Sequence, residues 1–203
     1  MTDVVTGTDG RTLSKKGART RQRLLDAAEQ VFADLGYHEA SIVKITEAAG
    51  VGQGTFYLYF ASKQAIFDEL VRHLSRRIRH TMSEAAEAGE TRFDSELLGF
   101  RAFFDFAIEH PGLYRIIRQA AFVSPEVFRW HYETLTERYS AALRESVERG
   151  ELGPIDPEVA AWALGAIGET IGMRWILWGE GRVPESVVAE VGRMIRAILE
   201  PAG

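Results

Sequence analysis

Residues 41–60, SIVKITEAAGVGQGTFYLYF, constrain the fold more than any other segment, because their pattern predicts two short helices joined by a glycine turn. Ser41 is a good N-cap, and apolar residues then recur at helical spacing on one face. Gly50 follows, and glycine adopts the left-handed backbone conformation without the steric cost that other residues meet. A second helix is expected from about Gln53. Two helices joined this tightly form a helix-turn-helix, whose second helix fits the DNA major groove.

The segment and its surroundings resemble the tetracycline-repressor (TetR) family. The resemblance runs from Thr20 to about Leu70 and rests on the leading helix RQRLLDAAEQVFADLGY, the block ITEAAGV, the signature TFYLYF and Lys63. It implies a dimeric, ligand-responsive repressor with an all-helical fold, whose first three helices bind the operator. The sequence departs from the family pattern at Thr46, where alanine is usual, and at Gly52, where serine is usual. The second helix therefore has a weaker side-chain cap.

Polar side chains in and around the second helix are the candidate DNA contacts. The resemblance assigns phosphate contacts to hydroxyl and ammonium groups, which can fix the register on the backbone without reading sequence. Neighbouring side chains would read bases, for example an amide paired in bidentate fashion with adenine. Packing between helices is the alternative for the two tyrosines. The candidates are Ser41, Thr55, Tyr57 and Lys63 for phosphates, Lys44 for guanine or phosphate, Gln53, Leu58 and Tyr59 for bases, and Gly54 for close approach to the backbone.

Apolar residues recur every three or four positions almost throughout the chain, and no alternating segment bounded by turn signals is found, so the sequence predicts an all-α protein. The 203 residues suffice for a small module attached to a larger one. We expect a flexible tail over 1–14, a helix-turn-helix DNA-binding domain over 15–61 and a ligand-binding and dimerisation domain over 62–203. A first helix is expected over 16–35, ending at Gly36, and further helices over 62–82, 93–109, 113–121, 125–149, 157–179 and 184–199.

Charge is unevenly divided along the chain. The net charge is -5, but residues 1–80 carry 12 Lys and Arg against 9 Asp and Glu, a balance of +3, and the remainder carries -8. A basic first part suits contact with phosphates, while ordinary surface charge is the alternative. The chain has no cysteine, which excludes disulfides, zinc-thiolate sites and cysteine nucleophiles. Neither a signal peptide nor a membrane span is expected, so the predicted location is cytoplasmic.

A dimer surface is expected on the last two long helices. Small residues of the segment 157–179 are spaced four, three and four apart and share one face, which would let another helix approach closely. Glycine costs about 1 kcal/mol in a helix relative to alanine, so this stripe indicates a packing requirement. Contact with a helix of the same chain is the alternative. The predicted interface comprises Ala161, Gly165, Gly168, Gly172, Val188, Val191 and Ile195.

An unusual aromatic content in the middle of the body favours an apolar ligand pocket, although packing in the core is the alternative for most of these side chains. Charged residues within otherwise apolar helices add to the case, because an unpaired buried charge is costly. Their alternatives are a mutual salt bridge or an exposed edge. The predicted ligand contacts are Phe103, Phe104, Tyr114, Arg118, Phe122, Trp162 and Glu169.

The sequence therefore predicts a dimeric repressor that releases a palindromic operator when a small, largely apolar ligand binds. The stretch HPGLYRIIRQAAFVSPEVF is similar to TetR-type regulators that sense acyl-coenzyme A esters, including aromatic ones. In that alternative, phosphates would lie near Arg115, Arg118 or the arginines of the segment 62–82. An enzyme is not expected, because the five histidines lack metal-ligand spacing and no nucleophile elbow, P-loop or HExxH occurs. A strongly basic, sequence-independent DNA binder is also disfavoured, and neither a cofactor nor a metal is expected.

Overall fold

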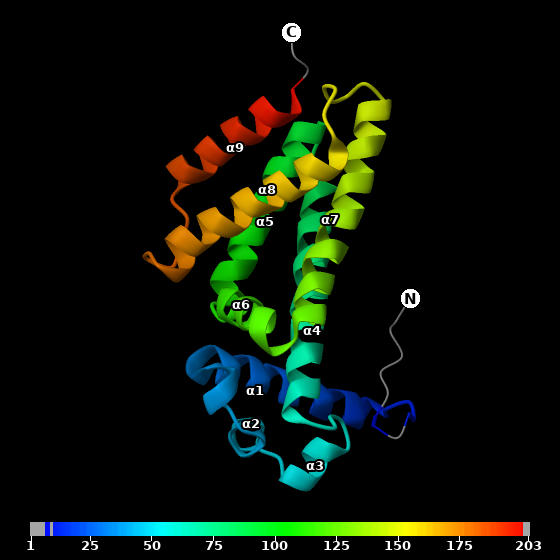
Figure 1. Ribbon diagram of the computed structural model, residues 1–203, viewed down its shortest axis with the longest axis vertical. Helices are drawn as coiled ribbons and strands as arrows, with labels where there is room; N and C mark the ends of the chain where they lie inside the picture. Colours follow the sequence, from blue (N-terminus) through cyan, green and yellow to red (C-terminus); the bar gives the residue numbers. More distant parts are fainter. Residues whose placement is uncertain (1–6, 9, 201–203) are drawn as a thin grey trace. The chain divides into compact units, whose positions relative to one another are not determined.

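The computed structural model describes residues 7, 8 and 10–200, and Figure 1 shows helices joined by short loops. Among these residues there is no strand, so the predicted all-α class is confirmed. Residues 1–6 and 9 of the predicted tail lie outside the described residues. The elements are α1 (Lys15–Glu39), α2 (Ile42–Ala49), α3 (Gln53–Tyr57), α4 (Lys63–Ala86), α5 (Arg92–Glu109), α6 (Leu113–Val123), α7 (Pro125–Glu148), α8 (Pro157–Gly172), a π-helical turn (Met173–Leu177) and α9 (Glu185–Leu199).

Side-chain caps explain where several of these helices begin. The Ser41 hydroxyl accepts a hydrogen bond from the Lys44 N–H at 3.2 Å, which confirms its predicted N-cap role at α2. Thr91 and Asp94 form a capping box at the start of α5, and Asp156 caps α8. Such caps each contribute about 1 kcal/mol, and they bring the observed helix ends close to those expected from the sequence.

Regular α-helix ends at Gly36 in α1 and at Gly172 in α8, where a π-helical turn follows. Gly36 has a φ of 76° and a ψ of 166°, so the regular part of α1 ends there, as predicted. The segment expected as one helix over 157–179 differs from the prediction, because α8 ends at Gly172 and the chain continues as the π-helical turn.

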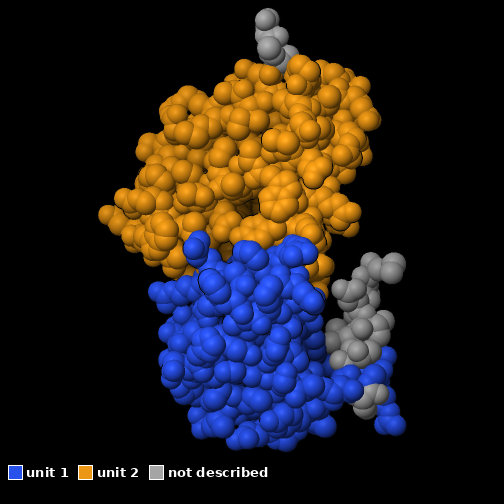
Figure 2. Space-filling model, viewed as in Figure 1, with its two compact units in different colours: residues 1–74, 115–129 blue, residues 75–114, 130–203 orange. Residues whose placement is uncertain are grey.

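The chain packs as two compact units, which Figure 2 colours separately. Unit 1 comprises residues 1–74 and 115–129, and unit 2 comprises residues 75–114 and 130–203. This division falls within α4, whereas the boundary expected at 61 and 62 separates functional segments and stays a prediction. The core of unit 1 includes Leu24, Phe32, Ile45, Phe56, Phe67 and Leu70, and that of unit 2 includes Phe100, Leu143, Leu164, Val191 and Ile195.

Within unit 2, α5 packs against both α8 and α9, and these last two helices also contact each other. At the edge of this layer, the Arg101 guanidinium donates to the Glu185 carboxylate, with 2.8 Å between Nη1 and Oε2. The Arg196 guanidinium lies over the Phe93 ring, 3.8 Å from its centroid. None of the described helices is long and apolar enough to cross a membrane.

Candidate DNA-binding surface and effector cavity

The turn between α2 and α3 is fixed by Gly50 and by a guanidinium from α1. Gly50 has a φ of 61° and a ψ of 42°, which is the left-handed conformation predicted for it. The Val51 N–H donates to the Thr46 carbonyl at 3.0 Å and closes the end of α2. Arg23 donates to the Ala49 carbonyl and, at 3.4 Å, to that of Gly50. The angle between α2 and α3 is therefore held both by the turn's own backbone and by α1.

α3 buries its aromatic side and presents its polar side to solvent. Phe56 is 0% exposed and Phe60 is 3% exposed, which anchors the helix in unit 1. Tyr57 is 50% exposed and Leu58 is 62% exposed. Of the other candidates, Gln53 and Gly54 are exposed, whereas Thr55 and Tyr59 are half-buried. The outer side thus offers amide and phenol groups, the donors and acceptors that a DNA groove can meet.

The residues before α1 add a contact that the sequence did not reveal. The Thr8 N–H donates to the Leu58 carbonyl at 3.1 Å, and the Thr8 hydroxyl donates to the Tyr57 carbonyl, also at 3.1 Å. Carbonyls at a helix C-terminus lack partners within the helix. Thr8 therefore closes the end of α3, a helix that has no side-chain hydrogen bond at its N-cap, Gly52.

Lys63 ties the start of α4 to the end of α1. Its ammonium donates to the carbonyls of Tyr37 at 2.7 Å and Ala40 at 2.8 Å, and it lies 3.4 Å from that of His38. It also lies over the Tyr37 ring, 4.4 Å from the centroid. An ammonium has three N–H donors, so these carbonyls occupy its hydrogen-bonding capacity.

Unit 2 contains a cavity of about 250 Å³ between α4, α5, α7 and α8. Its walls are mostly apolar and include Met82, Phe100, Phe103, Leu135 and Leu164. Such an apolar cavity with a few polar groups is the usual form of a small-molecule site. Among the described residues, no group of three or more side chains is placed to hold a metal ion.

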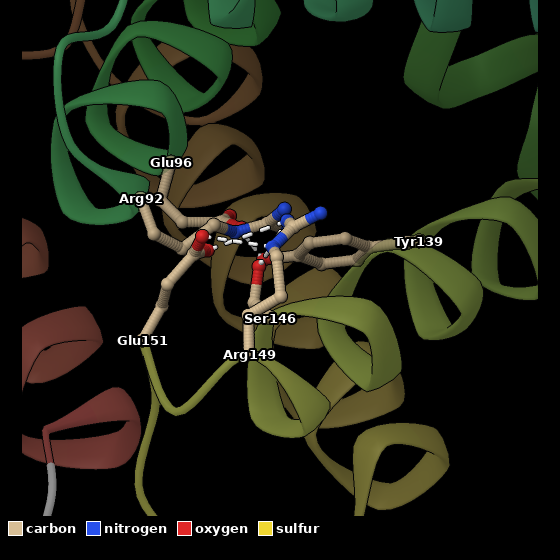
Figure 3. Close-up of polar contacts among 6 residues, drawn as sticks. All are labelled: Arg92, Glu96, Tyr139, Ser146, Arg149 and Glu151. Atoms are coloured by element: carbon tan, nitrogen blue, oxygen red, sulfur yellow. Dashed lines mark hydrogen bonds and ion pairs between the residues drawn. The ribbon is translucent and has the colours of Figure 1, made fainter.

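A polar cluster lies at the wall of this cavity, and Figure 3 shows its side chains converging from α5, α7 and the loop after α7. The buried Glu96 carboxylate accepts hydrogen bonds from the Arg92 guanidinium and from the Tyr139 hydroxyl. Burial, followed by the negative charge of Glu96, raises the pKa of Tyr139 well above its ordinary value. Arg149 pairs with Glu151 nearby, with 2.8 Å between Nε and Oε1. Arg92 therefore has a buried counter-ion.

Behind Phe103, a second polar group is enclosed by α5 and α8. Tyr114 is 4% exposed, and its hydroxyl has no hydrogen-bond partner in the part of the chain that the structure describes. Burial and then the negative charge of Glu169 raise the pKa of Tyr114. The Glu169 carboxylate itself accepts from the Tyr132 hydroxyl at 2.9 Å. Gly172 leaves space for Tyr114, because a Cβ there would lie 1.7 Å from the phenol oxygen.

Comparison with known proteins identifies the family. Residues 24–70 match the family described as bacterial regulatory proteins, tetR family. The HTH-type transcriptional regulator YdgC of Bacillus subtilis (strain 168) is 32% identical over 200 residues, which cover 94% of this chain and 98% of YdgC. The chain belongs to the tetR family.

Solved structures of tetR-type regulators share its fold. The fatty acid degradation regulator FadR from Bacillus halodurans has a TM-score of 0.79 at 20% identity, covering 91% of this chain and 96% of that one. FadR from Bacillus subtilis, in complex with stearoyl-CoA, has a TM-score of 0.76 at 21% identity, covering 86% of this chain and 96% of that one. At these identities the likeness concerns the fold.

In this tetR-family chain, the predicted DNA contacts all lie between Ser41 and Lys63. The ammonium groups of two of them, Lys44 and Lys63, form hydrogen bonds with backbone carbonyls. Lys44 is exposed, although its ammonium donates to the Glu39 carbonyl at 3.0 Å. The Lys63 ammonium is likewise bonded to carbonyls at the end of α1, and its contact with phosphate stays a prediction. The DNA roles of Ser41 and of the α3 residues stay predictions.

Most of the predicted ligand contacts do not line the cavity. Of the seven, only Phe103 does so. Arg118 and Phe122 belong to unit 1, and Phe122 is 90% exposed, so neither contributes to a cavity whose lining residues all belong to unit 2. Trp162 is 44% exposed and stacks on Tyr132. The remaining three, Phe104, Tyr114 and Glu169, lie in the packing around Phe103 or α8 and do not line the cavity.

The predicted dimer face also requires correction, because it points into its own protomer. A Cβ at Gly168 would lie 3.2 Å from the Phe100 ring, and Gly172 is filled by Tyr114. Gly168 and Gly172 therefore accommodate aromatic rings of the same chain, which was the alternative. Ala161, Gly165 and Gly168 line the cavity, and Val188, Val191 and Ile195 are buried at 5%, 1% and 0% exposure.

Proposed function

We propose that this tetR-family regulator is a dimeric repressor that binds a palindromic operator through α3 and releases it when a small, largely apolar molecule enters the unit 2 cavity. The observation that carries the proposal is the exposed polar side of α3, held beside a rigid glycine turn in unit 1, together with an apolar cavity in unit 2. A short, rigidly supported helix with exposed amide and phenol groups suits insertion into a major groove.

α4 is the element suited to couple the two events. It is one helix of 24 residues that begins with Lys63 in unit 1 and carries Arg79 and Met82 on the cavity wall in unit 2. A ligand shifts a conformational equilibrium only by its difference in affinity for the two states. We propose that it binds best to the state in which the two α3 helices no longer match successive major grooves, about 34 Å apart.

The DNA part of the proposal is tested with the duplex that the wild-type chain selects from a randomised library. We expect Gln53→Ala to weaken binding by about 5-fold to 150-fold, since a bidentate amide contact to adenine is worth about 1–3 kcal/mol. Gln30→Ala is the matched control, because Gln30 is also an exposed helical glutamine in unit 1, on α1. Equal affinities of the two variants in a gel-shift titration would count against groove recognition by α3.

For the dimer, we propose the outward faces of α8 and α9 instead of the inward stripe. Val159 is 65% exposed, Trp162 44% and Met194 42%, which is high for large apolar side chains on neighbouring helices. Two copies of this helix pair would form a four-helix interface. Val159→Lys together with Met194→Lys should yield monomers in sedimentation velocity runs while the helical circular dichroism is retained. Unchanged dimers would rule this surface out.

A second candidate is a regulator that senses an acyl-coenzyme A ester. It is favoured by the apolar cavity with an α4 arginine at its wall and by the shared fold with FadR in complex with stearoyl-CoA. Arg115 fits this role less well, because it donates to the Ala33 carbonyl at 3.1 Å. Mass spectrometry of small molecules that co-purify with the native protein tests it. A coenzyme A ester should be released on denaturation, and an uncharged apolar compound in its place would support the first candidate.

A further inference from the structure

The cavity wall is electrically asymmetric. Three arginines line it: Arg79 from α4, Arg92 from α5 and Arg138 from α7. Arg92 is neutralised by Glu96, one helical turn away. Within the described part of the chain, neither Arg79 nor Arg138 forms a hydrogen bond or ion pair with a carboxylate. One part of the wall is therefore compensated and another carries excess positive charge.

Arg79 is the more exceptional of the two cations, because it is half-buried. Its Nη1 atom is fully enclosed and has no hydrogen-bond partner among the described residues. Burial, followed by the positive charges of Arg138 and then Arg76, lowers the pKa of Arg79. Its guanidinium carbon lies 5.5 Å from the centroid of the Trp130 ring, which offers packing but no counter-charge.

An unpaired, partly desolvated cation is costly, and a charge-assisted hydrogen bond would offset that cost. We propose that the cavity binds an organic anion with an apolar body, whose acidic group lies between Arg79 and Arg138 and whose body lies along Met82, Phe100 and Leu164. This inference rests on the proposed function, in which the cavity is the effector site. The Arg92–Glu96 pair leaves no uncompensated positive charge on its part of the wall, so the acidic group is expected at Arg79 and Arg138.

The size of the cavity limits the apolar body. At about 250 Å³ it is smaller than the roughly 300–1,000 Å³ of typical pockets for drug-sized ligands. A chain of medium length would fill it, and the nucleotide of a coenzyme A ester would remain outside. The anion could then be the carboxylate of a free acid or a phosphate of such an ester, and these share the same recognition chemistry.

The experiment compares decanoate, decanol and decanoyl-coenzyme A, using the fluorescence of tryptophan as the readout, since Trp130 packs against Arg79. We expect decanoate, decanoyl-coenzyme A or both to bind at least tenfold more tightly than decanol. Arg79→Gln should weaken binding of the anions at least tenfold and leave binding of decanol unchanged. If only decanoate shows this pattern, the anion is a carboxylate, and if only the ester shows it, the anion is a phosphate.

Two further variants sharpen the result. Arg138→Gln should also weaken anion binding, whereas Arg144→Gln is the matched control on α7, because Arg144 is exposed and does not line the cavity. Ser83→Glu would place a carboxylate one turn after Arg79, on the cavity wall, and should repel the anions as strongly as loss of the arginine. Thermal unfolding confirms that each variant is folded, and removal of an uncompensated cation should not lower Tm.

Equal affinity for decanol and both anions, insensitivity of anion binding to Arg79→Gln, or no binding of any of the three probes would overturn the inference. The proposed function fails in a different way. If decanoate binds through Arg79 and yet does not release the selected duplex in a gel shift, the anion site stands and the effector role of the cavity is wrong.

Discussion

Replacing Gly172 with alanine tests what the small residues of α8 are for. A Cβ at this position would lie 1.7 Å from the Tyr114 phenol oxygen and 2.8 Å from its ring carbon Cζ. The ring cannot move away freely, because it packs edge-on against Phe103, with centroids 6.4 Å apart. Overpacking of this kind costs about 1–3 kcal/mol. Alanine recovers about 1 kcal/mol through its higher helix propensity. The net loss should therefore be up to about 2 kcal/mol, and the very short contact with Tyr114 favours the upper end of that range.

Gly165 provides the matched control, since it lies on the same stripe of α8 and a Cβ there would meet no atom within 4 Å. Gly165→Ala should leave the free energy of unfolding unchanged or raise it by up to about 1 kcal/mol. In the double variant Tyr114→Phe with Gly172→Ala, the nearest clashing atom is gone, so part of the lost stability should return. A coupling energy between the two sites is the expected signature of contact within one chain.

The assay is urea unfolding followed by circular dichroism, together with sedimentation velocity at several protein concentrations. For a chain of this length, about 2 kcal/mol corresponds to a fall in Tm of roughly 4–8 °C. The oligomeric state should not change at concentrations where the variant is folded. If Gly172→Ala instead produced stable monomers from dimers, the stripe would face a partner chain, and the reasoning from packing inside the protomer would be refuted.

Three further predictions concern single side chains. Lys63→Gln should lower the free energy of unfolding by about 1.5–3 kcal/mol in the absence of DNA, because a charged donor to several carbonyls is lost. An unchanged urea midpoint would instead mean that Lys63 does not stabilise the fold and would leave phosphate contact as its role. Thr8→Val should weaken duplex binding without changing the slope of affinity against salt, since no phosphate contact is removed; a shallower slope would contradict this. Burial and then the positive charge of Arg79 lower the pKa of His131 to about 4. The unfolded chain therefore takes up a proton between about pH 6.5 and 4 that the folded chain does not, and stability should fall by up to about 3 kcal/mol as the pH drops through that window. His131→Phe should lose this dependence in urea titrations at pH 7 and pH 4.5.

The helices and the glycine turn could be predicted from the sequence because their causes are local. Gly50 adopts the left-handed conformation and Ser41 caps α2 through interactions within a few residues, so the letters of one short segment contain the cause. The same holds for Ser62, whose hydroxyl accepts from the Ala65 N–H at 3.0 Å at the start of α4. The inward positions of Phe56 and Phe60 also follow from helical spacing.

The roles of the body residues could not be predicted in the same way, because spacing fixes which residues share a face but not what meets that face. The spacing of Gly168 and Gly172 indicates a close-packing surface, yet its partners are aromatic rings of α5 and α6 in the same chain. Phe122 follows the apolar pattern of its helix and is nevertheless 90% exposed in the protomer. Thr8 was missed because its contact with α3 spans 50 residues and has no periodic signal.

One signal for the cavity was present in the sequence, in the register of charges along each helix. Residues three and four apart are neighbours on a helix surface, so a carboxylate at either spacing can neutralise an arginine. Arg92 has Glu96 four positions later, and the two form an ion pair. The corresponding positions around Arg79 are serines, a methionine and another arginine, and those around Arg138 are alanines, a leucine and a threonine. Arg138 is exposed to solvent, whereas Arg79 is half-buried, so Arg79 is the one that needs a partner elsewhere in the fold or in a ligand. In unit 2 the structure provides none for Arg79 among the described residues, and for that reason an anion is the chemistry that best completes the cavity.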